Sequence, residues 1–291
     1  MQPFYGFSAL FLALIIPYFA CFVSVYQMFG VIQFTLIKLY LIWSALYLVY
    51  SIPTWIKTGW FSLGAFKDYG FALITSGSYY HLWYLASLIY ALPLFFLCVK
   101  HINNRKVLLV ITIVLYLVKA ISYGYYEWLP NVVKSILALC YKFSALFDAA
   151  FLILPLLLLG YFIRHNSIKF IWFSLLGFVL SFGFLFAEAF TLKSFGGEKV
   201  SFILMTFPTA YFFFLSVSHI QIKRCGRIIS MLGWASLMIY CFHPMALELF
   251  DDFVTNSVFL YFCTATVSMT FAIIIYSIPQ IYHKSIHGER R

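Results

Sequence analysis

Apolar runs of about 20 residues, the length that crosses a bilayer as an α-helix, recur along the whole chain. Hydrophobic residues make up 64% of the sequence and charged residues 10%, and the mean hydropathy is +0.96. This composition leaves no stretch for a separate soluble domain. The sequence therefore predicts one all-α, polytopic membrane domain over residues 1–291, a helix bundle of nine helices that begin near Phe4, Val31, Leu82, Val107, Phe147, Phe170, Ser201, Ile228 and Ser257.

Lys and Arg are distributed unevenly over the loops, and this distribution predicts the orientation, because basic residues accumulate on the cytoplasmic side. Twelve of them lie in one set of connections and six in the other. We therefore expect a plasma or inner membrane protein whose C-terminus is cytoplasmic. With nine crossings, the N-terminus of the chain is expected outside. The richer set comprises Lys38, Lys100, Arg105, Lys106, Arg164, Lys169, Lys223, Arg224, Arg227, Lys284, Arg290 and Arg291.

The formal net charge of +10 does not indicate a nucleic-acid partner. The basic residues are dispersed over short loops without interleaved aromatic residues, so the expected partner is the lipid bilayer. The six cysteines lie mostly within apolar runs and show no CxxC spacing. The chain also has no metal-binding His pair, phosphate loop or nucleophile elbow. We expect no metal and no bound cofactor, and the internal repeat of many transporters is not detectable.

Five ionisable residues stand in or at the ends of apolar runs: His81, Lys119, Asp148, Glu188 and His243. A charged side chain inside a membrane costs about 3 kcal/mol on insertion scales, so each one requires a partner or a role. Lys119 lies near an outer helix end, where its side chain can reach the headgroups, and Asp148 fits a solvated acid at a helix start. All five map to the same outer third of the membrane. Together they would line one polar pocket, suited to acid–base catalysis or to binding a polar ligand for transport.

Three stretches carry aromatic and ionisable residues in a characteristic order. They are residues 78–88 (SYYHLWYLASL), Glu188 followed by a short hydrophilic loop and residues 207–212 (FPTAYF), and residues 232–244 (LGWASLMIYCFHP). The first is similar to a His-Leu-Trp-Phe/Tyr-Leu segment and the last to a Ser-Leu-x-Ile-Tyr-x-x-His-Pro signature. In order and spacing the chain resembles membrane acyltransferase family 3, multi-pass bacterial proteins that typically acylate extracytoplasmic sugars. The resemblance covers essentially the whole chain.

The resemblance implies transfer of an acyl group, typically acetyl, from acyl-CoA as co-substrate to a hydroxyl of a cell-envelope glycan or a lipid-linked sugar. Family members usually have ten helices, and the first carries an Arg and the His regarded as catalytic. Here no Arg precedes Arg105 and no His precedes His81, whereas Pro3–Ser8 is similar to the start of the family's second helix. The resemblance thus implies a missing first helix, and we expect no turnover from the chain as it stands. A glycan-lipid or organic-anion transporter, and an inactive truncated family member or membrane partner subunit, stay open as alternatives.

The polar residues and the resemblance together define the candidate site. Glu188, His81 and His243 are the candidates for proton transfer. The acceptor pocket is expected to contain His81, Trp83, Lys119, Asp148 and Glu188, with Trp83 stacking on a sugar face and Tyr84 packing on a helix or lipid. Basic residues on the cytoplasmic side suit the phosphates of coenzyme A: Arg105, Lys106, Arg164, Lys223, Arg224 and Arg227.

Overall fold

The computed structural model describes residues 29–165, 171–197, 202–219, 226–251, 253–254 and 256–288. These residues form helices joined by short connections, and no strand occurs among them. Six helical segments in these ranges are long and apolar enough to cross a membrane, as a multi-pass helical membrane protein requires. They are Gly30–Lys57, Trp83–His101, Arg105–Gly124, Ser144–His165, Ile171–Ser194 and Val258–Ser277.

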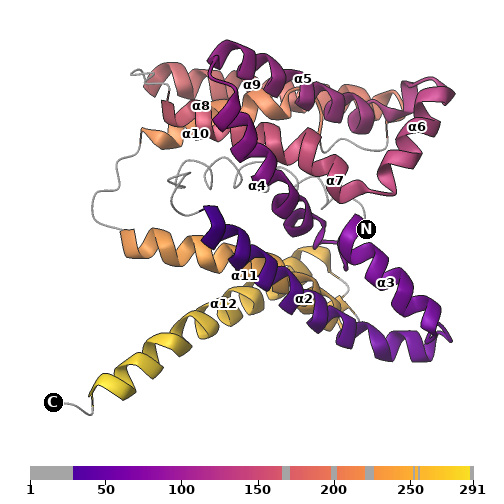
Figure 1. Cartoon of the computed structure of the whole chain (residues 1–291), viewed down its shortest axis with the longest axis vertical. Coiled ribbons are helices and arrows are strands. Elements are labelled where there is room, and N and C mark those ends of the chain that lie inside the picture. The colour runs from indigo at the N-terminus through magenta and orange to yellow at the C-terminus, as the bar shows by residue number, and fades with distance from the viewer. Residues whose placement is uncertain are drawn as a thin grey trace. The chain divides into compact units, whose positions relative to one another are not determined.

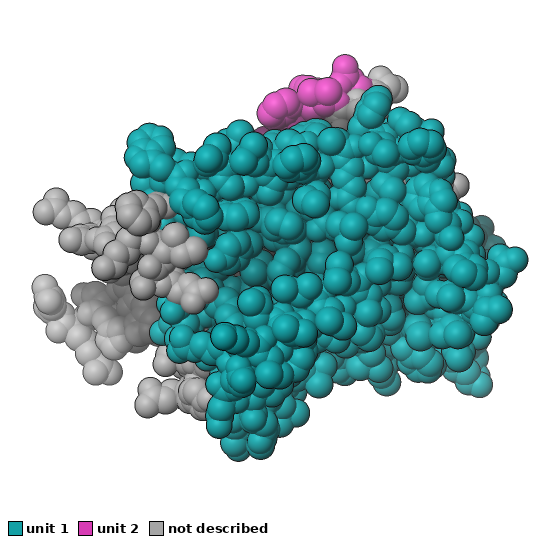
Figure 2. All heavy atoms as spheres, turned by 90° about the horizontal axis from the view of Figure 1, so that it is seen from above, with its two compact units in different colours: residues 1–220 teal, residues 221–291 magenta. Residues whose placement is uncertain are grey.

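The chain divides into two compact units, residues 1–220 and residues 221–291, which Figure 2 shows in different colours. Unit 1 contains α2 (Phe29–Lys57), α3 (Leu63–Thr75), α4 (Trp83–His101), α5 (Arg105–Gly124), the short 3-10 helix η1 (Tyr126–Trp128), α6 (Asn131–Tyr141), α7 (Ser144–Asp148), the π-helix η2 (Ala149–Ile153), α8 (Leu154–His165), α9 (Ile171–Ser194) and α10 (Thr206–Ser218). Unit 2 contains α11 (Gly226–Asp251) and α12 (Ser257–Gly288).

Six of the nine predicted membrane helices correspond to these six segments, and the count of nine stays a prediction. The predicted helix from Phe4 lies outside the described residues. The one from Ser201 corresponds to α10, which has 13 residues, and the one from Ile228 lies in α11. The structure also contains α3 and α6, which the apolar runs did not predict. Both helices are shorter than a membrane span and contain charged residues, so neither forms an apolar run of about 20 residues.

Polar side chains mark where several helices begin. The Asn104 side chain accepts hydrogen bonds from the backbone N–H groups of Lys106 and Val107, at 3.0 and 3.4 Å, and so caps α5. Ser62 caps α3 through the N–H of Ala65. Such caps satisfy N–H groups that the first helical turn leaves without a partner, and thereby fix the loop-to-helix boundary.

The continuous segment α7–η2–α8 is the centre of unit 1. In its most apolar stretch 67% of the residues are buried, against 17% for α9. It packs against α4 and α5, while α10 packs against α8 and α9 (Figure 1). The exposed side of α9 carries large apolar side chains such as Trp172, Val179 and Phe190. Apolar exposure of this kind is expected of a surface that faces lipid rather than water.

Unit 2 is a pair of helices. α11 and α12 pack against each other, and the rings of Phe242 and Phe271 stack with centroids 4.0 Å apart. Cys241, Ser268 and Ala272 are fully buried, and the two small side chains on α12 allow a close approach of α11. Pro244 lies within α11, where it removes one helical hydrogen bond.

Candidate functional site

A buried ion pair joins α5 to α7. The Nζ atom of Lys119 donates a hydrogen bond to Oδ1 of Asp148 at 2.6 Å, and the two side chains are 2% and 13% exposed. Lys119 thus does not extend to the surface, and Asp148 is the buried last residue of α7 rather than a solvated acid. Charges taken out of water require such a partner, because removing one member of a buried pair costs about 3–5 kcal/mol.

Four aromatic rings surround the ammonium group of Lys119. Its Nζ atom lies 4.7 Å from the ring centroid of Tyr123, 5.5 Å from that of Phe202, and 5.7 Å from those of Tyr141 and Phe147. A cation over an aromatic face is attracted by the ring quadrupole, more strongly when water is excluded. These rings therefore attract the ammonium group and help to hold it beside Asp148.

A π-helical turn follows Asp148 directly. Residues Ala149–Ile153 form η2, in which the N–H of Leu154 donates to the carbonyl of Ala149, five residues earlier. Pro155, the second residue of α8, has no N–H to donate to the carbonyl four residues before it, which favours the wider turn. Isolated π-turns often occur at functional sites. Sequence reasoning missed this turn, and Pro155 within an apolar run was the signal for it.

Glu188, on α9, accepts three hydrogen bonds. Its carboxylate accepts from the backbone N–H groups of Leu204 and Met205, both at 2.8 Å, and from the hydroxyl of Tyr125. Met205 immediately precedes α10, so the carboxylate of Glu188 supplies the anionic cap of that helix. Burial, together with the adjacent Glu188 carboxylate, raises the pKa of the Tyr125 phenol. Tyr125 therefore stays protonated and available as a donor.

The segment 202–205 links the ion pair to Glu188. The ring of Phe202 faces Lys119, and the carbonyl of Ile203 accepts a hydrogen bond from the hydroxyl of Tyr116 at 2.8 Å. The N–H groups of the next two residues, Leu204 and Met205, donate to the carboxylate of Glu188. Lys119, Asp148 and Glu188 thus belong to one polar centre, which we define by these three residues together with Tyr116 and Tyr125. Of the five ionisable residues that the sequence placed in one pocket, the structure pairs Lys119 with Asp148 and connects this pair to Glu188 through segment 202–205.

His81 lies in the turn that precedes α4. Gly77, with φ +98°, permits this turn, since a Cβ at Gly77 would lie 2.5 Å from the backbone nitrogen of Trp83. The imidazole is 5% exposed and contacts the rings of Tyr47, Tyr79 and Tyr80, with centroids 4.8–5.6 Å away. In this structure His81 is enclosed by aromatic rings rather than open to water.

Trp83 is the first residue of α4 and is half-buried, with its indole 6.2 Å from the ring of Tyr84. Tyr84 is buried, in agreement with its expected packing role. α4 packs against α7, the helix that ends at Asp148. His243 belongs to unit 2 and is described within that unit alone, where its Nδ1 lies 2.8 Å from the carbonyl oxygen of Tyr240.

The basic residues expected to bind coenzyme A lie at the other end of the same helices. Arg105 and Lys106 begin α5, and Arg164 lies near the end of α8; all three are exposed. Lys119 is about 21 Å along α5 from Arg105, at 1.5 Å per residue. Lys223 and Arg224 lie outside the described residues. The backbone of Arg227 is described, in α11, without its side chain.

Comparisons with protein-family models, with curated proteins and with solved structures find no match to this chain. In the residues that the structure describes, no three His, Cys, Asp or Glu side chains are grouped so that they could hold a metal ion.

The two carboxylates of the polar centre differ in what they can do. Glu188 is occupied by three hydrogen bonds, whereas Asp148 uses only Oδ1, and its Oδ2 has no hydrogen-bond partner among the described residues. An anionic oxygen held in place by a lysine is a strong acceptor for a hydroxyl. The polar centre can thus position a ligand hydroxyl at Asp148 while Glu188 fixes the neighbouring segment.

Proposed function

We propose that this chain is a membrane-bound acyltransferase that moves an acyl group, typically acetyl, from acyl-CoA to a hydroxyl of a cell-envelope glycan or lipid-linked sugar. The sequence resemblance provides the reaction class. The observation that supports it best is Asp148, whose Oδ1 is held by Lys119 and whose Oδ2 makes no hydrogen bond with any described residue. An acceptor hydroxyl bound there would be oriented by an otherwise apolar helix bundle.

In the proposed reaction the acceptor oxygen attacks the thioester carbonyl carbon, its proton passes to a base, and the coenzyme A thiolate leaves. Glu188 already accepts three hydrogen bonds, so we assign it to positioning segment 202–205. Proton transfer is assigned to a histidine. In unit 1 the candidate is His81, and His243 stays a candidate from the sequence alone. Asp148 orients the acceptor and Lys119 orients Asp148.

The donor is assigned to the opposite end of the bundle. Arg105, Lys106 and Arg164 supply exposed positive charge there, suited to the phosphates of coenzyme A. The pantetheine arm would then have to cover the distance from these residues to the polar centre. Neutralising two of them with R105Q/K106Q should raise the KM for acyl-CoA and leave kcat nearly unchanged, whereas an unchanged KM would remove this assignment.

The test measures transfer of labelled acetyl from acetyl-CoA to envelope glycans by protein reconstituted in nanodiscs. It compares this chain with a version preceded by the helix that the family places first. We expect acetyl transfer that depends on Asp148. In the extended protein, D148N should raise the KM for the acceptor. E188Q should reduce turnover at least about ten-fold, because it displaces segment 202–205.

The exposed-lysine variant K193M should keep full activity and serves as the matched control. A folded extended protein that transfers no acetyl to any glycan acceptor would contradict the proposal. Accumulation of unmodified glycan-lipid inside proteoliposomes would instead identify a transporter.

A further inference from the structure

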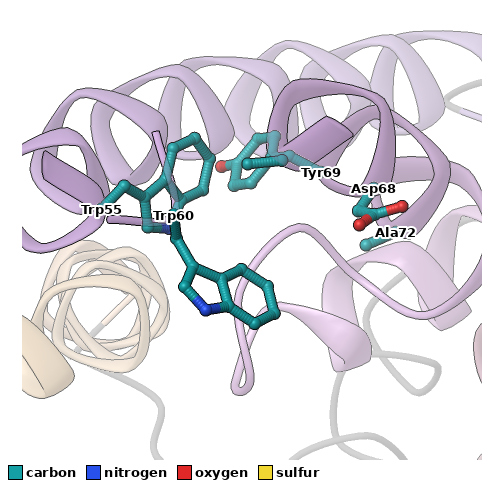
Figure 3. A pocket seen from close by; sticks show the side chains of 6 residues that line it. Trp55, Trp60, Asp68, Tyr69 and Ala72 are labelled. Atoms are coloured by element: carbon teal, nitrogen blue, oxygen red, sulfur yellow. The ribbon is translucent and has the colours of Figure 1, made fainter. Parts of the chain in front are cut away.

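A second site lies apart from the polar centre, in the hairpin of α2 and α3. It is a pocket of about 190 Å³, and Figure 3 shows the side chains that line it. Trp55 and Asp68 lie at opposite ends of this group, and the rings of Tyr69 and Trp60 lie between them. The lining residues are Trp55, Trp60, Ala65, Asp68, Tyr69 and Ala72.

The local backbone places both tryptophans at this pocket. The chain turns at Gly59, with φ +73°, and the N–H groups of Trp60 and Phe61 donate back to the carbonyl of Trp55, at 2.8 and 3.1 Å. This folds Trp60 toward Trp55. Glycine favours the turn because its missing Cβ removes the cost of the positive φ.

Two rings of the pocket, those of Trp55 and Tyr69, are held by contacts with neighbouring residues. Trp55 makes edge contacts with Phe66 and Tyr69, at centroid distances of 5.5 and 6.0 Å. The hydroxyl of Tyr69 donates a hydrogen bond to the carbonyl of Ser44, so this hydrogen is not available to a ligand. Trp60, by contrast, is 66% exposed. Two rings of the pocket, those of Trp55 and Tyr69, are thus packed in place, which reduces the entropic cost of binding, while the ring of Trp60 is accessible.

The charge of Asp68 indicates which class of ligand the pocket binds. Asp68 is the one charged side chain among the six lining residues, and it makes no hydrogen bond or ion pair with any residue described in the structure. A pocket lined by a carboxylate and by aromatic rings attracts an organic cation. A saccharide would require several donors and acceptors around it, whereas this lining offers one carboxylate and the indole N–H groups.

From this arrangement we propose that the pocket binds an organic ammonium group, held by Asp68 and by the rings of Trp55 and Trp60. The pocket lies at the C-terminal end of α2, a helix long enough to cross a membrane. Trp60 and Phe61 expose large aromatic surfaces there, as residues at the membrane interface do. The ammonium group comes from a lipid headgroup or from a soluble amine. Neither source depends on the acyl transfer proposed above.

The test uses the protein in phosphatidylglycerol nanodiscs, which contain no ammonium lipid. Choline is titrated against dimethylbutanol, a neutral analogue in which carbon replaces the charged nitrogen, with binding followed by calorimetry. We expect choline to bind and the neutral analogue to bind at least about ten-fold more weakly. Equal affinity for the two, or N-acetylglucosamine binding in place of choline, would overturn the proposal.

Variants separate charge from shape. D68N should weaken choline binding about ten-fold, D68E should restore most of it, and W60L should weaken it several-fold by removing one cation–π face. The controls are E127Q and W172F, which change an exposed acid and an exposed tryptophan elsewhere in unit 1. Choline affinity unaltered in folded D68N would contradict the assignment.

A second measurement identifies the source of the cation. Nanodiscs containing phosphatidylethanolamine are dissociated in a native mass spectrometer, and retained lipid is counted for wild type and D68N. Retention of this lipid in the wild type and its loss in D68N would establish a headgroup site. Choline binding without any retained lipid would support the proposal with a soluble amine as the ligand.

Discussion

The Nζ atom of Lys119 lies 2.6 Å from Oδ1 of Asp148, and this contact joins two membrane-length segments across 29 positions of sequence. The pair is buried, and four aromatic rings surround its cation. Each charge is therefore tolerated because of the other. This reciprocal dependence leads to the first prediction.

Breaking the ion pair on one side should destabilise the protein strongly. K119M leaves the carboxylate of Asp148 without its counter-charge, and D148N leaves the ammonium group without its own. Each should lower the free energy of unfolding by about 3 kcal/mol, while the double variant K119M/D148N should recover most of that loss. The measurement is thermal or denaturant unfolding in detergent. K193M, an exposed lysine change, is the control, and additive single effects would contradict the pairing.

Removing the carboxylate of Glu188 should loosen the start of α10. In E188A the N–H groups of Leu204 and Met205 lose their acceptor, so we expect their amide hydrogens to exchange at least about ten-fold faster. Hydrogen exchange with mass spectrometry over residues 202–206 measures this directly. E127Q, an exposed acid change, should leave exchange as in wild type. Unchanged protection in E188A would show that other contacts hold the segment.

The phenol of Tyr125 should make the stability of the protein depend on pH. Burial and the Glu188 carboxylate raise the pKa of its phenol above the ordinary value near 10. The folded state therefore holds this proton more tightly than the unfolded state, and the stabilisation is complete below pH 10 and is lost as pH rises toward the folded pKa. Y125F should be less stable than wild type by about 1 kcal/mol at pH 8.

This difference in stability should shrink as pH increases above about 10, because only the wild type loses the Tyr125 proton. Melting temperatures of both proteins between pH 8 and pH 11 provide the comparison. Other tyrosines titrate equally in the two proteins, so they cancel in the difference. A gap that stays constant or widens with pH would be inconsistent with the tyrosine as the proton donor.

Gly77 should be intolerant of a side chain. G77A places a Cβ 2.5 Å from the backbone nitrogen of Trp83 and forces a positive φ on alanine, so we expect a loss of stability of about 1–3 kcal/mol. The control is G183A, whose Cβ would have no atom within 4 Å. Circular dichroism melts of the two variants test this. Equal melting temperatures would mean that the turn before α4 readjusts at little cost.

The sequence was sufficient for the helices that are long and apolar. Runs beginning near Leu82, Val107 and Phe170 correspond to α4, α5 and α9, because a membrane-length helix satisfies its own backbone and depends only on local composition. Short helices such as α3 do not meet that criterion, since charged residues within them lower their hydropathy. The π-turn after Asp148 was also missed, because a single proline does not reveal how the preceding hydrogen bonds rearrange.

The chemical types in the polar centre were recognisable from the sequence, but their partners were not. A charged side chain in an apolar run is costly, so the sequence predicts a polar or charged partner for each of Lys119, Asp148 and Glu188. Which groups meet depends on how each helix is rotated and on which helices pack together, and these are tertiary properties. Glu188 therefore binds two backbone N–H groups 16 and 17 residues away, and Lys119 selects Asp148 rather than the headgroups. Local composition determined the helices, and packing alone decided which side chains face one another.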